Sequence, residues 1–271
     1  MELIIGVGLA AALVWGLVWC VQGDLVLGAL AVVIVGACLG HPFWKIELGP
    51  VPLTLDRILL AGLLTTYVVQ WRLGRTDPKP IGAADRWLLG LLGLLTVSFL
   101  LTGFPPEKLG EGSAPWRLAT GYLIPGLLYW SARQAPMEHR TVQRVWAVLG
   151  CLAVYLALTG VFERTGQWWA VWPKHIADPK VGIHFGRARG PMVHAVSFGL
   201  YLAVCWLAAG FWAFSRGRLA RLLFITGTPL FGAALFFCYT RSVWIGAALA
   251  GLVLIVLGLR GRVRIVALAA V

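Results

Sequence analysis

Three arginines stand out because they lie beside strongly apolar segments. Arg187 and Arg189 come shortly before the uncharged run 190–215, and Arg241 lies in a short turn between two apolar runs. A guanidinium group stays charged and offers a planar fork of donors that matches phosphate oxygens. Arg241 is the clearest case, because a charge in so short a turn between apolar helices is costly unless it is paired, reaches water or serves a function. We therefore predict that the three arginines bind a diphosphate. The alternative is that Arg241 reaches out to lipid headgroups.

His194 is the side chain near these arginines that could act as a general base on an acceptor hydroxyl. His175 and His184 lie in the same stretch, but no HxxxH or HExxH spacing is present, so no metal site is predicted. Glu163 directly precedes Arg164, which favours a local ion pair over a catalytic role. The sequence also lacks a GxSxG, Walker A or GxGxxG motif in a suitable context, and no cofactor is predicted.

Long apolar stretches must position these side chains. Of the 271 residues, 59% are apolar and 13% are charged, whereas about a quarter of a soluble domain is charged. The charges separate uncharged runs of about 20 residues, the length that crosses a hydrocarbon core. The sequence thus predicts an all-α fold, a polytopic transmembrane helical bundle of about nine spans plus the start of a tenth. The predicted helices cover residues 3–21, 25–39, 57–71, 87–103, 118–131, 145–162, 194–214, 222–238 and 243–259, and the tenth begins at Val263.

The basic residues indicate how the helices are oriented. Four short loops hold thirteen of the 23 Lys and Arg residues, four in the first and three in each of the others. Because Lys and Arg collect in short cytoplasmic loops, these four loops are predicted to be cytoplasmic. The remaining loops, among them 163–193 and the turn at Arg241, then face the exterior. This bias accounts for most of the net charge of +12, and no nucleic-acid binding is predicted.

The loop 163–193 is long for a connection between helices, which suggests a function. Its residues Trp168, Trp169 and Trp172 are predicted to lie at the membrane surface, with a stacking face for a sugar ring as the alternative. Residues 1–271 are interpreted as a single integral-membrane domain. The apolar run that begins at Val263 reaches only nine residues, too few to cross the membrane core, so we expect the N-terminal part of a longer protein.

Two of these segments resemble a known family. Residues 187–195 read RARGPMVHA and lead into an apolar helix, which is similar to the Arg-x-x-Gly-(Thr/Pro)-Phe-x-(Asn/His)-Pro segment of the O-antigen ligase and O-antigen polymerase family. Further along, residues 239–246 read YTRSVWIG, which resembles that family's Thr-x-Ser-Arg-Gly turn between two helices. Met192, Ala195 and the serine after Arg241 depart from the family pattern.

The resemblance implies an integral-membrane glycosyltransferase of the bacterial inner (cytoplasmic) membrane. Such an enzyme moves a glycan from an undecaprenyl-diphosphate carrier to an acceptor hydroxyl without a metal or cofactor. Arg187 and Arg241 would be catalytic and, together with Arg189, would bind the diphosphate on the periplasmic side. The partners would be the carrier-linked glycan, membrane lipids and a glycan or lipid acceptor. The family's proposed catalytic histidine would lie beyond residue 271, and His194 is the candidate within this chain.

Other classes stay open at this point. A transporter or permease would be consistent with Pro125 and the glycine-rich spans, although mid-span Asp, Glu, Lys and Arg are missing. A noncatalytic scaffold is a third possibility. The residues also do not separate a ligase, which passes a glycan to another acceptor, from a polymerase, which extends a growing chain.

Overall fold

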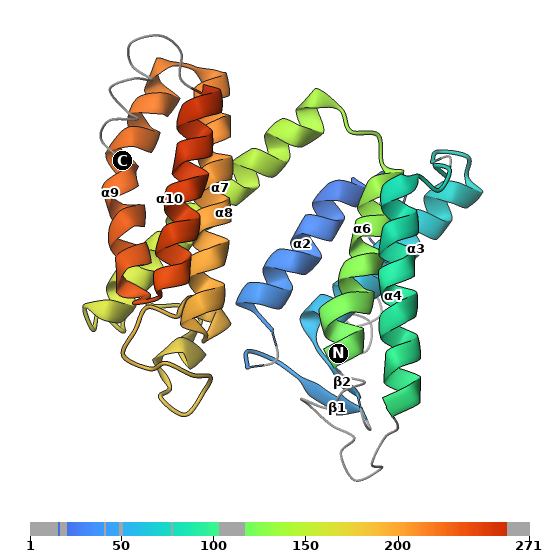
Figure 1. The fold of residues 1–271 in the computed structure, drawn as a ribbon, viewed down its shortest axis with the longest axis horizontal. Coiled ribbons are helices and arrows are strands. Elements are labelled where there is room, and N and C mark those ends of the chain that lie inside the picture. Colours follow the sequence, from blue (N-terminus) through green and yellow to red (C-terminus); the bar gives the residue numbers. More distant parts are fainter. Residues whose placement is uncertain are drawn as a thin grey trace, which may run out of the picture. The chain divides into compact units, whose positions relative to one another are not determined.

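The computed structural model describes residues 16, 21–40, 42–48, 51–76, 78–102 and 117–258 (Figure 1). The chain divides into two compact units: unit 1 lies within Met1–Gly36 and Trp44–Met137, and unit 2 within Ala37–Phe43 and Glu138–Val271. All the longer elements are helices, which confirms the all-α prediction. The start of a tenth span at Val263 and nearly all of the predicted span 3–21 lie outside the described residues. The single integral-membrane domain stays a prediction.

Unit 1 consists of helices and one short hairpin. Its described elements are α2 (Leu25–Cys38, with the last two residues in unit 2), β1 (Ile46–Leu48), β2 (Val51–Leu53), α3 (Leu55–Arg72), α4 (Ala83–Thr102), η2 (Ala119–Leu123) and α6 (Ile124–Gln134). The strands β1 and β2 are antiparallel, with Glu47 opposite Pro52. The hairpin was not predicted, because strands of three residues are too short to show an alternating pattern.

Pro125 does not end the helix that contains it. The π-helical turn η2 comes directly before α6, and Pro125 occupies the second position of α6. The backbone N–H of Ile124 donates to the carbonyl of Ala119, five residues back. A proline lacks the N–H that an α-helix needs, and a wider turn is one way in which a helix adapts to it.

A buried carboxylate joins α4 to α6 within unit 1. Asp85 is 2% exposed and forms an ion pair of 2.9 Å with Arg133. The Tyr129 hydroxyl donates to the other Asp85 oxygen at 3.0 Å. Next to this cluster, the Lys79 ammonium donates to the carbonyls of Arg133 and Ala135 at 2.7 and 2.6 Å. Lys79 therefore provides hydrogen bonds to carbonyl groups at the C-terminal end of α6.

Unit 2 is a bundle of four long helices with a structured loop at one end. Its described elements are α7 (His139–Arg164), the 3-10 turns η3 (Lys174–Ala177) and η4 (Gly190–Met192), α8 (Ala195–Arg216), α9 (Arg218–Phe237) and α10 (Arg241–Gly258). α8 packs against α7, α9 and α10. Its buried side chains are mainly small, and a Cβ at Gly199 would overlap Val243 of α10. Small residues let the helix backbones approach closely, as in membrane helix pairs.

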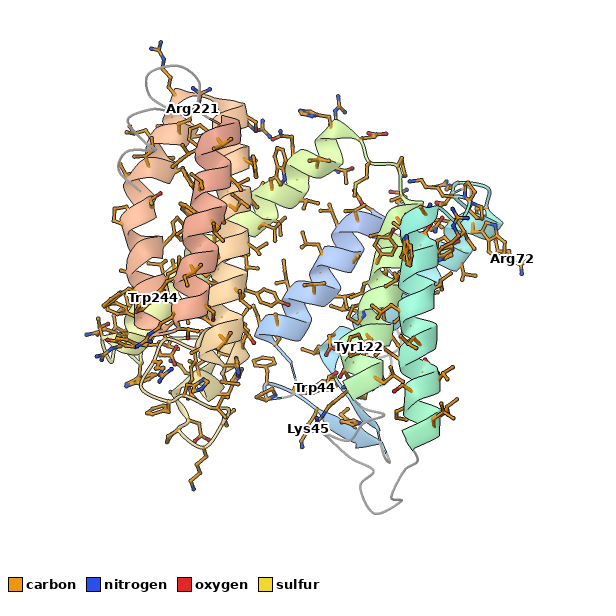
Figure 2. All side chains as sticks on the ribbon, viewed as in Figure 1. Trp44, Lys45, Arg72, Tyr122, Arg221 and Trp244 are labelled. Atoms are coloured by element: carbon orange, nitrogen blue, oxygen red, sulfur yellow. The ribbon has the colours of Figure 1, made fainter. Side chains whose placement is uncertain are left out.

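The connections of unit 2 lie at two opposite ends. The loop between α7 and α8 and the turn between α9 and α10 lie at one end, and the turn between α8 and α9 lies at the other (Figure 1). Trp244 and Arg221 mark these two ends (Figure 2). Within unit 2, the predicted exterior and cytoplasmic loops are thus separated, as a bundle that crosses a membrane requires.

Four described helices are long and apolar enough to cross a membrane: Ala83–Leu101 in α4, and α7, α8 and α9. Shorter apolar stretches occur at Leu25–Cys38 and Arg241–Val253. The helices are therefore compatible with a membrane protein, as the sequence predicts. The count of about nine spans stays a prediction.

Candidate functional site

The predicted long loop 163–193 corresponds to residues 165–194 between α7 and α8, and it is ordered throughout. It contains η3 and η4 and a series of backbone hydrogen bonds, such as that from the N–H of Ile183 to the carbonyl of Val193 at 3.0 Å. Val171, Ile176 and Ala188 are fully buried. The loop is therefore a packed part of unit 2, and it holds its side chains in fixed positions.

Arg189 and Glu163 form the centre of this loop. Arg189 is fully buried, and its Nε lies 3.2 Å from Oε1 of Glu163, at the end of α7. The other carboxylate oxygen, Oε2, accepts the backbone N–H groups of Arg189 and Gly190 at 2.9 and 2.8 Å. The ion-pair role predicted for Glu163 is confirmed, but its predicted partner, Arg164, is wrong. We call this pair, Glu163 and Arg189, the clasp.

The guanidinium of Arg189 also holds the far side of the loop. Its Nη2 donates to the carbonyls of Ile176 and Asp178, both at 2.8 Å, and its Nη1 donates to the carbonyl of Val181. The guanidinium carbon lies 4.7 Å from the centre of the Phe185 ring. Four of the five guanidinium donors therefore have partners inside the protein, and the charge is not presented to solvent.

The aromatic side chains of the loop take different places. Trp168 stacks on Phe185 with a 5.9 Å centroid distance and an 8° interplanar angle. Trp169 is 79% exposed and Trp172 is 51% exposed. Trp172 lies edge-on to Phe43, which belongs to the same unit, at 5.8 Å. Trp168 is thus part of the packing of the loop, whereas Trp169 is free to contact a membrane surface or a sugar ring.

The loop is fastened to the turn between α9 and α10. The backbone N–H of Ala188 donates to the carbonyl of Phe237 at 2.9 Å. The Arg164 guanidinium lies 5.8 Å from the centre of the Tyr239 ring and 3.5 Å from its hydroxyl. Tyr239 has a φ of +49°, a left-handed conformation that closes the tight turn. These contacts bring Arg187 and Arg241, 54 residues apart in the sequence, to the same end of unit 2.

Arg187 and Arg241 differ from Arg189 in their exposure. Both are exposed, and within the described part of the chain neither guanidinium forms an ion pair or hydrogen bond. Arg241 is the first residue of α10. The N-terminus of a helix already carries a partial positive charge, so an arginine there is favoured by an anion beside it.

This end of unit 2 is strongly positive. Its loop and turn carry six basic side chains against two carboxylates, and one of those carboxylates is paired inside the clasp. The N-termini of α8 and α10 lie here as well, and both favour negative charge. The basic side chains are Arg164, Lys174, Lys180, Arg187, Arg189 and Arg241. The arrangement suits a ligand with several anionic oxygens.

His194 caps the helix that begins beside it. Its Nδ1 accepts the backbone N–H of Ser197 at 3.1 Å and lies 3.1 Å from the Ser197 hydroxyl. A neutral imidazole has one acceptor nitrogen, so accepting at Nδ1 places the proton on Nε2. In this tautomer His194 offers an N–H donor rather than a base. The His184 ring lies edge-on to His194 at 5.4 Å.

His175 is a partly buried histidine of this loop. Its Nε2 donates to the carbonyl of Pro191 at 3.3 Å, and its Nδ1 is buried with no hydrogen-bond partner among the described residues. Burial lowers the pKa of His175, and the positive charge of Arg189 acts in the same direction. Protonation would place a second N–H where it finds no acceptor.

We expect the folded protein to lose stability as the pH falls through about 6.5, the ordinary histidine pKa, because the unfolded chain then binds a proton that the folded chain does not. Thermal unfolding in detergent between pH 7.5 and 5.5 measures this slope. His175→Gln keeps a donor for Pro191 and should flatten the slope. His184→Gln, a change at an exposed histidine of the same loop, should leave it in place. An equal slope in the His175 variant would contradict this assignment.

Among the described residues, no group of three or more His, Cys, Asp and Glu side chains could hold a metal ion. Comparison with protein families, with characterised proteins and with solved structures finds no match to this chain. The class that the structure defines is therefore an all-α protein with apolar helices of membrane-spanning length. Its candidate site is the cationic end of unit 2.

Sequence reasoning predicted Arg187, Arg189, His194 and Arg241 as site residues, and the structure brings these four residues to the same end of unit 2. It missed the pairing of Glu163 with Arg189, because the two residues are 26 positions apart and no local spacing rule links them. One signal was present in the sequence. Glu163 ends an apolar helix that carries no other acidic residue, which is typical of a carboxylate with a buried partner.

Proposed function

We propose that this chain is a membrane glycosyltransferase that moves a glycan from an undecaprenyl-diphosphate carrier to an acceptor hydroxyl, of the O-antigen ligase or polymerase type. The observation that carries the proposal is a pair of exposed arginines, Arg187 and Arg241, which have no ion pair or side-chain hydrogen bond to any described residue and lie at the cationic end of unit 2, where two helices begin. The proposal includes the bacterial cytoplasmic membrane as the location, a bundle of about nine spans, and the periplasmic side for both arginines.

The proposed reaction is a displacement at the anomeric carbon of the glycan. The acceptor oxygen forms a bond to this carbon, and the bond between the carbon and the diphosphate oxygen breaks. The electron pair of that bond leaves with the diphosphate, and the acceptor hydroxyl passes its proton to a base. Fixed cations near the diphosphate stabilise the charge that develops there. Arg187 and Arg241 are proposed for this role.

The other two predicted site residues take supporting roles in this proposal. Arg189 is buried within the clasp, so it acts as a positioning residue that holds Arg187 two residues away. His194 presents Nε2–H, which suits a hydrogen bond to an anionic oxygen of the leaving group better than proton abstraction. The base is then supplied from elsewhere, which agrees with the later histidine that the family resemblance implies.

Replacing Arg187 or Arg241 by alanine should lower glycan transfer roughly 10²–10³-fold, the cost of removing one donor to a developing charge. The full-length protein, reconstituted in proteoliposomes with a carrier-linked glycan, provides the measurement, and the product on the acceptor is the readout. Arg218→Ala is the matched control, because Arg218 is also an exposed first residue of a helix but lies at the opposite end of unit 2.

Wild-type transfer rates in both variants, with the protein present in the membrane, would rule out the proposed roles. Movement of substrate across the vesicle membrane without a glycan product would favour the transporter class instead. Product length distinguishes the two enzyme types, because a polymerase extends the glycan by repeat units and a ligase attaches it to a different acceptor.

A further inference from the structure

A second cationic cluster lies at the opposite end of unit 2, around a polar pocket between the start of α7 and the end of α8. The pocket has a volume of about 380 Å³, within the range of small-ligand sites. Its lining includes the cationic side chains Arg140, Arg144 and Arg216, together with His139, Gln143 and Ser215. The proposed transfer site uses none of these residues.

The arginines of this pocket lack an anionic partner. In the described part of the chain, no carboxylate forms an ion pair with Arg140, Arg144 or Arg216. The first turn of α7 holds no acidic residue and begins with His139 and Arg140. Cations at a helix N-terminus oppose the helix dipole, so an anion bound among them would be stabilised by the arginines and by the helix.

Two neutral polar side chains line the pocket and are hydrogen-bonded to each other. Nε2 of the buried Gln143 lies 3.2 Å from Oγ of Ser215, which donates to the carbonyl of Trp212 at 2.8 Å. Because the hydroxyl proton of Ser215 is used inside the protein, the guanidinium groups are the main donors left for a ligand. Planar guanidinium forks match the oxygens of a phosphate group.

Aromatic side chains lie about one helical turn from the lining residues on α7 and α8. The Arg216 guanidinium lies 5.7 Å from the centre of the Trp212 ring, and Trp146 stacks on Phe211 with a centroid distance of 5.9 Å. Tryptophan rings near helix ends are typical of the headgroup level of a membrane. Val148 and Cys151 follow Arg144 by about one and two turns of α7, so they lie on the same face of this helix, and both are exposed. The cationic pocket therefore lies beside exposed apolar side chains of α7.

We propose that this pocket binds the phosphate group of an anionic phospholipid, with the lipid tails against the apolar surface of α7. Basic pockets between helices at the cytoplasmic face are suited to such headgroups. The shared chemistry is a phosphate ester, which a lipid or a soluble compound could supply, and the apolar surface favours the lipid. The site is separate from the proposed transfer site, and its test needs no glycan.

The test measures how lipids stabilise the purified full-length chain in detergent. Phosphatidylglycerol should raise the midpoint of thermal unfolding, whereas phosphatidylcholine with the same acyl chains should raise it much less. Arg144→Gln and Arg216→Gln should each weaken the apparent affinity for phosphatidylglycerol about tenfold or more, because each removes hydrogen bonds to a charged group. Arg218→Gln removes an equal charge at the same end without lining the pocket, and it should keep the wild-type affinity.

Each outcome decides the proposal. Equal stabilisation by the two lipids, or equal affinity in all three variants, would overturn it. Full stabilisation by inorganic phosphate alone would overturn the lipid assignment and indicate a soluble phosphate compound. The unfolding midpoints of the variants without added lipid show whether each still folds. Should Arg144→Gln and Arg216→Gln both fail to fold, Arg144→Lys and Arg216→Lys take their place, because lysine keeps the charge but loses the planar fork, and each should bind phosphatidylglycerol more weakly than Arg218→Lys does.

Discussion

Glu163→Gln lowers the free energy of unfolding by about 3–5 kcal/mol, the range for a buried ion pair that loses one partner. The substitution keeps the size of the side chain but removes the charge opposite Arg189, which is fully buried. The amide NH2 group of the glutamine would take the place of Oε1, the oxygen that accepts the Arg189 Nε–H, so two donors would face each other. Thermal unfolding in detergent and limited proteolysis of residues 165–194 provide the measurement. Because the clasp holds Arg187, the proposed glycan transfer should fall as well.

Two further variants identify the cause of this loss. Asp178→Asn removes an exposed carboxylate from the same loop and should change stability little. Combining Glu163→Gln with Arg189→Met should recover part of the loss, because the uncompensated charge is then gone. The recovery should be incomplete, since the carbonyls of Ile176, Asp178 and Val181 lose their donor. A stable, protease-resistant Glu163→Gln protein would show that the clasp does not organise the loop.

Gly190→Ala is expected to cost roughly 2–5 kcal/mol, from left-handed backbone strain together with overpacking of a filled core. Gly190 has a φ of +53°, and a Cβ at this position would overlap the ring of Phe198. Phe198 is fully buried, and its opposite edge lies against Gly160 of α7, where a Cβ would come within 2.7 Å of the ring. The ring is thus held between two glycines and has no room to move. Thermal unfolding in detergent measures the effect.

Gly186→Ala separates the two causes. Gly186 has a φ of +90° in the same loop, but no atom lies within 4 Å of the position that its Cβ would take. This variant should show the backbone strain alone. Adding Phe198→Leu to Gly190→Ala should give a smaller loss than the sum of the single changes, because the two positions are in contact. Equal losses for Gly186→Ala and Gly190→Ala would contradict the overlap with Phe198.

The helices of this protein could be predicted from sequence with small errors at their ends. The expected segments 25–39, 57–71 and 194–214 correspond to α2, α3 and α8 within two residues, whereas α4 and α9 begin four residues before the predicted start and α7 begins six residues before it. Uncharged apolar runs separated by basic residues are a strong signal, because the cost of placing charge in a bilayer core is large. The β1–β2 hairpin and the π-helical turn before Pro125 were missed, since each rests on a few backbone hydrogen bonds without a compositional signature.

For the candidate site as well, the sequence predicted some features and missed others. The sequence indicated Arg187 and Arg241, because a charge close to the apolar core of a membrane protein is costly unless it is paired, reaches water or serves a function. The same reasoning grouped Arg189 with them, although the structure places Arg189 in the interior with Glu163 and three carbonyls. Residue type alone cannot distinguish an arginine that binds a ligand from one that stabilises a loop, because both use the same guanidinium N–H donors.

The sequence by itself thus determined the helical class, the approximate helix ends and the group of arginines beside apolar segments. These properties follow from local composition and from the free energy of transferring charged and apolar groups between water and an apolar phase. The tertiary structure alone decided which arginine is buried, which two are exposed, and that residues 187 and 241 lie at one end of unit 2. Those facts depend on contacts between distant segments, such as Ala188 with Phe237 and Glu163 with Arg189, and no local pattern encodes them.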